Sequence, residues 1–147
     1  MAEPGRKILG SLIVLSMVFS LVAVLAPVVS AQEDPVYPGA TEDTEAEALL
    51  QLQFENVGIV RVYTSLDSSS TIADWYRTEM TQLGWTKENE STSSYEGQTV
   101  YYFLYKQIDR GLILAMEPGE GGNSMIVTLA GSWESISLFL GLHHLRA

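Results

Sequence analysis

The chain has 147 residues, and 46% of them are hydrophobic, which predicts one small globular domain with an ample core. Its 18 acidic and 8 basic side chains give a formal net charge of -10, so electrostatics disfavours nucleic acid or an anionic membrane surface as a partner of the folded part. Cysteine is absent, which excludes disulfides, thiol nucleophiles, thiolate zinc sites and lipid attachment through an N-terminal cysteine.

Residues 1–31 predict export. Arg6 and Lys7 precede an uninterrupted run of apolar and small residues from 8 to 29. Compact residues stand three positions and one position before a cut after Ala31, as in a cleavable signal peptide. The run also has the roughly 20 apolar residues that span a bilayer. Two interpretations therefore stay open: a signal peptide, or an N-terminal membrane anchor with the domain outside.

Residues 32–46 are interpreted as an acidic linker. They contain Pro35, Pro38 and Gly39 together with several acids and little apolar content, a composition typical of irregular chain. The folded domain is therefore predicted to occupy residues 47–147.

The domain is predicted to open with a β-hairpin. Leu50, Leu52 and Phe54 alternate with polar residues, which is the period of a half-buried strand. Residues 59–64 form a second β-rich run, joined to the first through residues 56–58.

The segment 69–83 carries the strongest signal, an amphipathic helix with both ends marked. Hydroxyl side chains at 68–71 suit the unpaired N–H groups of a first turn. Gly84 can adopt the left-handed conformation that ends a helix. Apolar residues recur between these ends at spacings of three and four, which predicts one buried face: Ile72, Trp75, Tyr76, Met80 and Leu83.

Four more strands are predicted after this helix, at residues 85–90, 99–108, 112–116 and 124–130. A polar loop at 91–97, a tight turn at 109–111 and a glycine-rich hairpin connection at 117–123 separate them. Short consecutive strands with tight turns indicate an antiparallel sheet. The predicted fold class is α+β, a two-layer sandwich in which about five or six strands carry one main helix on one face.

The C-terminal segment, residues 132–145, is predicted to form a helix whose apolar surface is wider than one stripe. It covers the sheet or, alternatively, contacts a membrane surface or a protein partner, the latter through a surface containing Trp133, Phe139, His143 and His144. Adjacent histidines on a helix point about 100° apart, so these two do not predict a metal site.

No motif predicts a catalytic, cofactor or metal site. Serine never occurs in a G-x-S-x-G context, and the glycine-rich stretch 119–123 lacks the lysine and the following helix of a phosphate loop. The alternative is a pair of carboxylates brought together by the fold. Asp67, Asp74, Glu79 and Asp109 are the candidates for such a pair.

Four short motifs occur between residues 37 and 85: Tyr37-Pro38-Gly39-Ala40, Tyr63-Thr64-Ser65 followed by Asp67-Ser68, Trp75-Tyr76, and Gly84-Trp85. This pattern resembles a loose group of small exported or lipid-anchored prokaryotic proteins of unknown function. The resemblance implies export and an α+β domain, and it implies no activity. The lipid-attachment cysteine of some members is absent here.

We therefore expect an extracytoplasmic, non-enzymatic binding or accessory domain of the cell envelope, with no cofactor and with a ligand that the sequence does not identify. Two alternatives stay open. One is a small hydrolase or isomerase that uses two carboxylates. The other is a subunit of an envelope complex, tethered to the membrane through residues 1–31 and bound to a protein partner through its C-terminal segment.

Overall fold

The computed structural model describes residues 34–142. The predicted export segment and the two histidines of the C-terminal segment, His143 and His144, lie outside the described residues. The fold below belongs to the compact unit that begins at Pro35.

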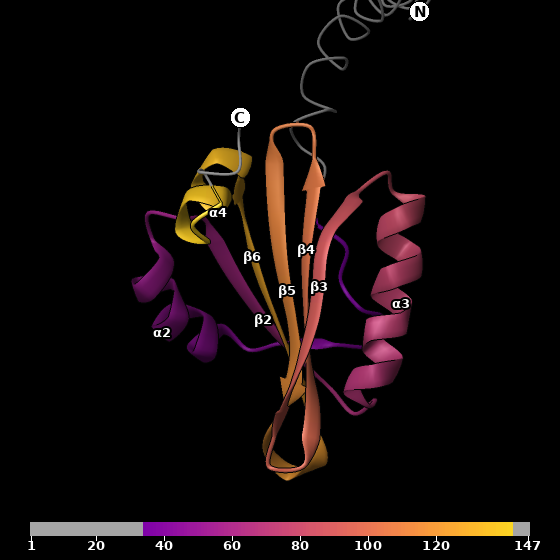
Figure 1. Ribbon diagram of the computed structural model, residues 1–147. Helices are drawn as coiled ribbons and strands as arrows, with labels where there is room; N and C mark the ends of the chain where they lie inside the picture. The colour runs from indigo at the N-terminus through magenta and orange to yellow at the C-terminus, as the bar shows by residue number, and fades with distance from the viewer. Residues whose placement is uncertain (1–33, 143–147) are drawn as a thin grey trace, which may run out of the picture. The chain divides into compact units, whose positions relative to one another are not determined.

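One antiparallel sheet forms the centre of the domain (Figure 1). Its six strands lie in the order β1-β2-β6-β5-β4-β3, so β2 pairs with the last strand of the chain and the other strands neighbour one another in sequence. The strands are β1 (Thr41–Glu42), β2 (Ile59–Ser65), β3 (Thr86–Tyr95), β4 (Gln98–Gln107), β5 (Arg110–Pro118) and β6 (Ser124–Ser132). The α+β class with an antiparallel sheet is confirmed.

Helices cover both faces of this sheet. The helix α3 (Ser69–Gln82) lies on one face, and α2 (Thr44–Phe54) and α4 (Trp133–Phe139) lie on the other (Figure 1). A short 3-10 turn, η1 (Glu120–Gly122), sits in the β5–β6 connection. The expected main helix and C-terminal helix are confirmed, but the expected two layers are three, because α2 and α4 form a second helical layer.

The ends of α3 follow the predicted pattern. The Ser68 side chain accepts a hydrogen bond from the backbone N–H of Thr71 at 3.2 Å, which caps the first turn. At the other end Gly84 has a φ of 87°. This left-handed residue lets the N–H groups of Gly84 and Trp85 donate to the carbonyls of Thr81 and Met80, a Schellman motif.

The segment predicted as the first strand is the helix α2. Asp43 caps it by accepting from the N–H of Ala46, and acidic residues occupy its first turn, where the helix dipole favours them. Leu50 and Phe54 lie one helical turn apart and pack on the sheet, whereas Leu52 is 71% exposed. The alternating pattern thus did not mark a buried strand face, and the predicted hairpin is wrong.

Side chains of α2 also complete the edge of the sheet. Strand β1 pairs with only two residues of β2, which leaves backbone groups of β2 without a neighbouring strand. Glu47 accepts from the N–H of Val62 at 3.0 Å, and Gln51 accepts from the N–H of Val60 and donates to the carbonyl of Gly58, both at 2.9 Å. The helix therefore takes the place of a longer edge strand.

The predicted polar loop at 91–97 is mostly strand. Strand β3 continues to Tyr95, and only Glu96 and Gly97, with φ of 51° and 79°, turn the chain back into β4. Because β3 is an edge strand with both faces largely exposed, its serines and threonines are compatible with strand pairing. The polar composition of β3 reflects its exposure, and the predicted loop is wrong for residues 91–95.

Residues 35–40, within the segment interpreted as a linker, pack on the α3 face. The Tyr37 ring is buried and lies edge-on against Trp75, with 5.4 Å between ring centroids. Its hydroxyl donates to Asp67 at 2.6 Å. This contact fixes the entry of the chain into the domain.

Candidate functional site

The α4 face of the sheet is only partly covered. Helices α2 and α4 pack over β2, β6 and β5, where Val60, Val62 and Leu129 are buried. Toward β4 and β3 the same face stays open, and Tyr102 is 40% exposed there. A cavity of about 590 Å³ lies in this open part, lined by Glu88, Asn89, Ser91, Tyr102, Phe103, Leu104, Ile113, Leu140 and Leu142.

The strand register explains why these residues meet. Ser91 pairs with Tyr102, and Leu104 lies between Asn89 on one side and Ile113 on the other. Paired residues point to the same side of a sheet, so these rungs form one surface. Tyr102, Leu104 and Ile113 thus form an apolar floor on β4 and β5, with the polar Asn89 and Ser91 beside it on β3.

The end of α4 supplies one wall. Gly141, with a φ of 74°, closes a second Schellman motif in which the N–H of Leu142 donates to the carbonyl of Ser137 at 2.7 Å. This turn reverses the chain after the helix, and Leu140 and Leu142 both line the cavity. The helix itself is held against the sheet by Ile136, which is fully buried next to Gly111.

A second cavity of about 380 Å³ continues along the same face toward the β3–β4 turn. Its lining residues are Ser93, Ser94, Tyr95, Val100, Tyr102, Glu117 and Pro118. Tyr102 lines both cavities. We call the two cavities together the sheet groove.

Glu117 is the carboxylate at the far end of the sheet groove. The residue is half-buried, and burial raises the pKa of its carboxyl above the ordinary value. No hydrogen bond or ion pair joins its side chain to another residue between 34 and 142. Within the described part of the chain, Glu117 therefore presents an unpaired acid to the groove.

Glu90, on the α3 side of β3, shows the opposite arrangement. It accepts two hydrogen bonds from Arg77, at 2.8 and 3.3 Å, and one from Lys87. These bonds lower the pKa of Glu90 to about 2. The Arg77 guanidinium also lies 5.1 Å from the centroid of the Phe103 ring. Arg77 therefore links α3 to the sheet through both the Glu90 ion pair and a cation–π contact.

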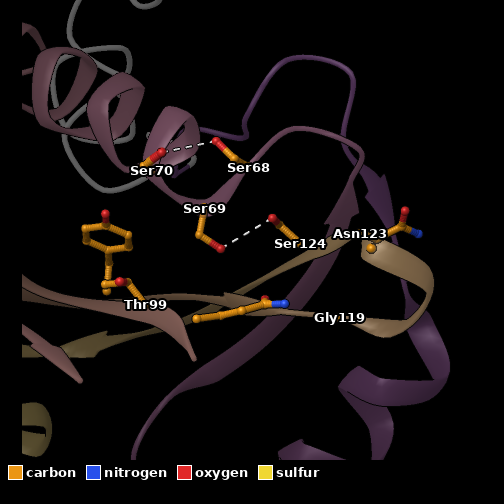
Figure 2. Close-up of a pocket in the computed structure, with 10 residues that line it drawn as sticks. Ser68, Ser69, Ser70, Thr99, Gly119, Asn123 and Ser124 are labelled. Carbon is orange, nitrogen blue, oxygen red and sulfur yellow. Dashed lines mark hydrogen bonds between the residues drawn. The ribbon is translucent and has the colours of Figure 1, made fainter. Parts of the chain in front are cut away.

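A third cavity, of about 410 Å³, is polar and lies on the α3 face (Figure 2). It is lined by Ser68, Ser69, Ser70, Gln98, Thr99, Tyr101, Gly119, Gly122, Asn123 and Ser124. Its serine hydroxyls already bond to one another, Ser68 to Ser70 at 3.1 Å and Ser69 to Ser124 at 3.3 Å (Figure 2). Ser124 also donates to the carbonyl of Asp67 at 2.7 Å. This cavity is consequently the weaker candidate, and its glycine-rich rim is the predicted hairpin connection.

Of the residues proposed from sequence as a binding surface, Trp133 and Phe139 are described, and both belong to α4. Trp133 is half-buried and its ring lies 5.0 Å from the Lys106 ammonium, while Phe139 is 49% exposed and packs edge-on against Phe54. Neither of them lines the groove. Sequence reasoning missed Tyr102, Leu104 and Glu117, whose alternating positions on β4 and β5 were the available signal.

The four acids considered for a carboxylate pair have separate surroundings. Asp67 is bonded to Tyr37 and Asp74 to Arg77, whereas Glu79 lies near the end of α3. Asp109 is in the β4–β5 turn and its carbonyl accepts from the N–H of Trp133. Within residues 34–142, the structure forms no catalytic pair from these acids.

The helices of the described region include none that is long and apolar enough to cross a membrane.

The fold and the site together define an α+β domain whose antiparallel sheet carries a groove beside its C-terminal helix. The model of the START domain-like family matches residues 43–124, from the cap of α2 to the start of β6. This match covers more than half of the chain, and the chain belongs to the START domain-like family. No curated protein matches the sequence.

Proposed function

We propose that this chain is an exported, non-enzymatic domain of the cell envelope that binds a small apolar molecule in the sheet groove. The observation that carries the proposal is the open apolar floor formed by Tyr102, Leu104 and Ile113, walled by Leu140 and Leu142. Membership of the START domain-like family supports a binding role. The location rests on the predicted export segment, residues 1–31, and on the resemblance to exported proteins.

The size and chemistry of the groove suit such a ligand. Small-molecule sites are typically about 300–1,000 Å³ and largely apolar with a few polar groups, and the larger cavity alone has about 590 Å³. Each square ångström of apolar surface removed from water contributes roughly 25 cal/mol. A ligand that covers the exposed side of Tyr102 and its neighbours would therefore gain hydrophobic free energy without any rearrangement of the sheet.

Binding can be tested by filling the groove from its exposed edge. Ser91 lines the groove and Thr92 points to the opposite face of β3, and both are exposed, so Ser91→Phe and Thr92→Phe form a matched pair that removes no core side chain. The neutral fluorophore N-phenyl-1-naphthylamine reports on apolar sites through its emission. We expect the native domain and Thr92→Phe to bind it, and Ser91→Phe to bind it on the order of tenfold more weakly.

Equal binding by both variants would place the fluorophore elsewhere and contradict the groove as the site. Absence of saturable binding to the native domain would contradict a binding function for this groove altogether. Circular dichroism of both variants shows whether the fold is kept.

Export is tested separately by intact mass and membrane partitioning of the full chain expressed in an exporting host. A soluble species beginning at Gln32 supports a released domain, and a full-length species in the membrane fraction supports a tethered one. A full-length species in the cytosol would contradict export.

A further inference from the structure

Two carboxylates line the sheet groove, the exposed Glu88 in the larger cavity and the half-buried Glu117 in the smaller one. Glu117 lies on β5 two residues beyond Ala115, which itself follows Ile113 by two, so all three point to the face that carries the groove. The carboxylate is half-buried beside Val100 and Pro118. A purely apolar ligand in the sheet groove would make no favourable contact with this carboxylate.

The environment of this carboxylate favours a positive partner. Partial burial makes an unpaired charge costly, and a cation in contact with it would offset that cost. None of the described residues that line the groove is basic. Lys106, the basic residue farther along the same face of β4, lies over the Trp133 ring instead. Among residues 34–142, the groove lining therefore supplies no counter-ion.

Two aromatic rings accompany the carboxylate. Tyr95 and Tyr102 line the same cavity as Glu117, and they are 61% and 40% exposed. The face of a tyrosine ring attracts cations, most strongly where water is partly excluded. The hydroxyl of Ser93, which pairs with Val100 on the groove face, can accept a hydrogen bond from an ammonium N–H.

We propose that the sheet groove takes a small molecule with an apolar body and an ammonium head, and that Glu117 binds the head beside the rings of Tyr95 and Tyr102. The apolar body then lies along Leu104 and Ile113 toward Leu140 and Leu142. The net charge of -10 attracts a cation to the domain from solution. This inference rests on the proposed function and adds the charge of the ligand to it.

The strand geometry also sets the length of the ligand. Val100, in the cavity of Glu117, and Leu104, in the larger cavity, are four residues apart on β4. At about 3.3 Å per residue this spans roughly 13 Å. A decyl chain is of this length and is a suitable probe.

Three probes that differ only in the head group test the proposal: decylammonium, decanol and decanoate, each below its micelle concentration at pH 7. Their affinities are measured by displacement of N-phenyl-1-naphthylamine and by calorimetry. We expect decylammonium to bind on the order of tenfold more tightly than decanol, because a charge-assisted hydrogen bond is added to the same apolar contact. Decanoate is expected to bind more weakly than both.

The matched variants are Glu117→Gln and Glu120→Gln. Glu120 is an exposed acid in η1 that does not line the groove, so it carries the same charge change outside the site. Glu117→Gln is expected to abolish the preference for decylammonium over decanol. Glu120→Gln is expected to keep the preference.

The possible negative results contradict different claims. Equal affinities of the native domain for decylammonium and decanol would overturn this inference and leave the apolar groove standing. A preference that persists in Glu117→Gln would also overturn it, since the cation would then be held elsewhere. If the native domain binds neither the fluorophore nor any of the three probes, the proposed function fails as well. The comparison of probes on the native domain needs no variant, so it decides the question even if Glu117→Gln does not fold.

Discussion

The two faces of the sheet differ in how completely helices cover them. On the α3 face, Ile72, Tyr76 and Met80 are fully buried against Phe103 and Leu114, and the helix covers the middle of the sheet. On the α4 face, two short helices leave β3 and β4 open, and the sheet groove lies there. The comparison indicates that the α3 face is packed over β4 and β5, whereas the α4 face is packed over β2 and β6 and leaves apolar surface open toward β4 and β3.

Glu90 and Glu117 lie on opposite faces of the sheet and differ in whether the side chain has an ionic partner. Glu90 is held by Arg77 and Lys87, and its ionised form is stabilised by the fold. Glu117 is half-buried and unpaired within residues 34–142, and its ionised form is destabilised. A satisfied ion pair fastens elements together, whereas an unsatisfied charge is available to a ligand.

The largest expected effect is loss of a core ring on the α3 face. Tyr76→Ala removes a fully buried side chain and is expected to lower the free energy of unfolding by about 3–5 kcal/mol, because a cavity remains in a packed core. Tyr102→Ala in the groove is expected to cost only about 1 kcal/mol. Urea unfolding of both variants measures the difference, and equal losses would contradict the difference in coverage between the two faces.

The second prediction concerns α4, which the sequence left open as either part of the core or a docking segment. Ile136→Ala is expected to cost about 2–4 kcal/mol, since the side chain is fully buried. Leu138→Ala, at a position 60% exposed on the same helix, is expected to change stability by less than about 0.5 kcal/mol. Thermal unfolding of the two variants shows whether α4 supports the fold. An unfolding temperature of Ile136→Ala equal to that of the native domain would show that it does not.

The third prediction tests the edge of the sheet on the α4 side. Gln51→Ala leaves the N–H of Val60 and the carbonyl of Gly58 without their partner, which is expected to cost about 1–2 kcal/mol. Gln53→Ala, at an exposed position on the same helix, serves as the control and is expected to be near neutral. Hydrogen exchange at Val60 should accelerate in Gln51→Ala only. Unchanged protection of that amide would mean that the side chain is not what covers the edge.

The helix α3 and the class of the sheet could be predicted from the sequence. The helix α3 was predictable because its cap, its apolar spacing and Gly84 all act within one segment. The antiparallel class followed from short strands and glycine turns. Local signals of this kind need no tertiary information.

The errors arose where tertiary context decides. In α2, Leu50 and Phe54 fit a strand period and a helix period equally, and only the contacts with β2 distinguish them. The groove was hidden for a similar reason. Tyr102 and Glu117 are separated by 15 positions in sequence, and only the pairing of β4 with β5 places them in one cavity.

The smallest and most specific prediction compares the pH dependence of the two glutamates. Because the pKa of Glu90 falls from 4.5 to about 2 on folding, its contribution to stability is present above pH 4.5 and is lost as the pH falls toward 2. Glu90→Gln should therefore be less stable than the native domain at pH 7, by about 1 kcal/mol, and the difference should close under acid.

The sign reverses for Glu117, because its folded pKa is raised: the protonated carboxyl is the form that folding favours, and stability is lost as the pH rises through that pKa. Glu117→Gln should be slightly more stable than the native domain at pH 7 and equal to it in acid. Urea unfolding of both variants at several pH values measures the two slopes. If Glu117→Gln were destabilised at neutral pH, the carboxylate would have a stabilising partner in the free protein, and the groove would no longer offer an unpaired acid to a cationic ligand.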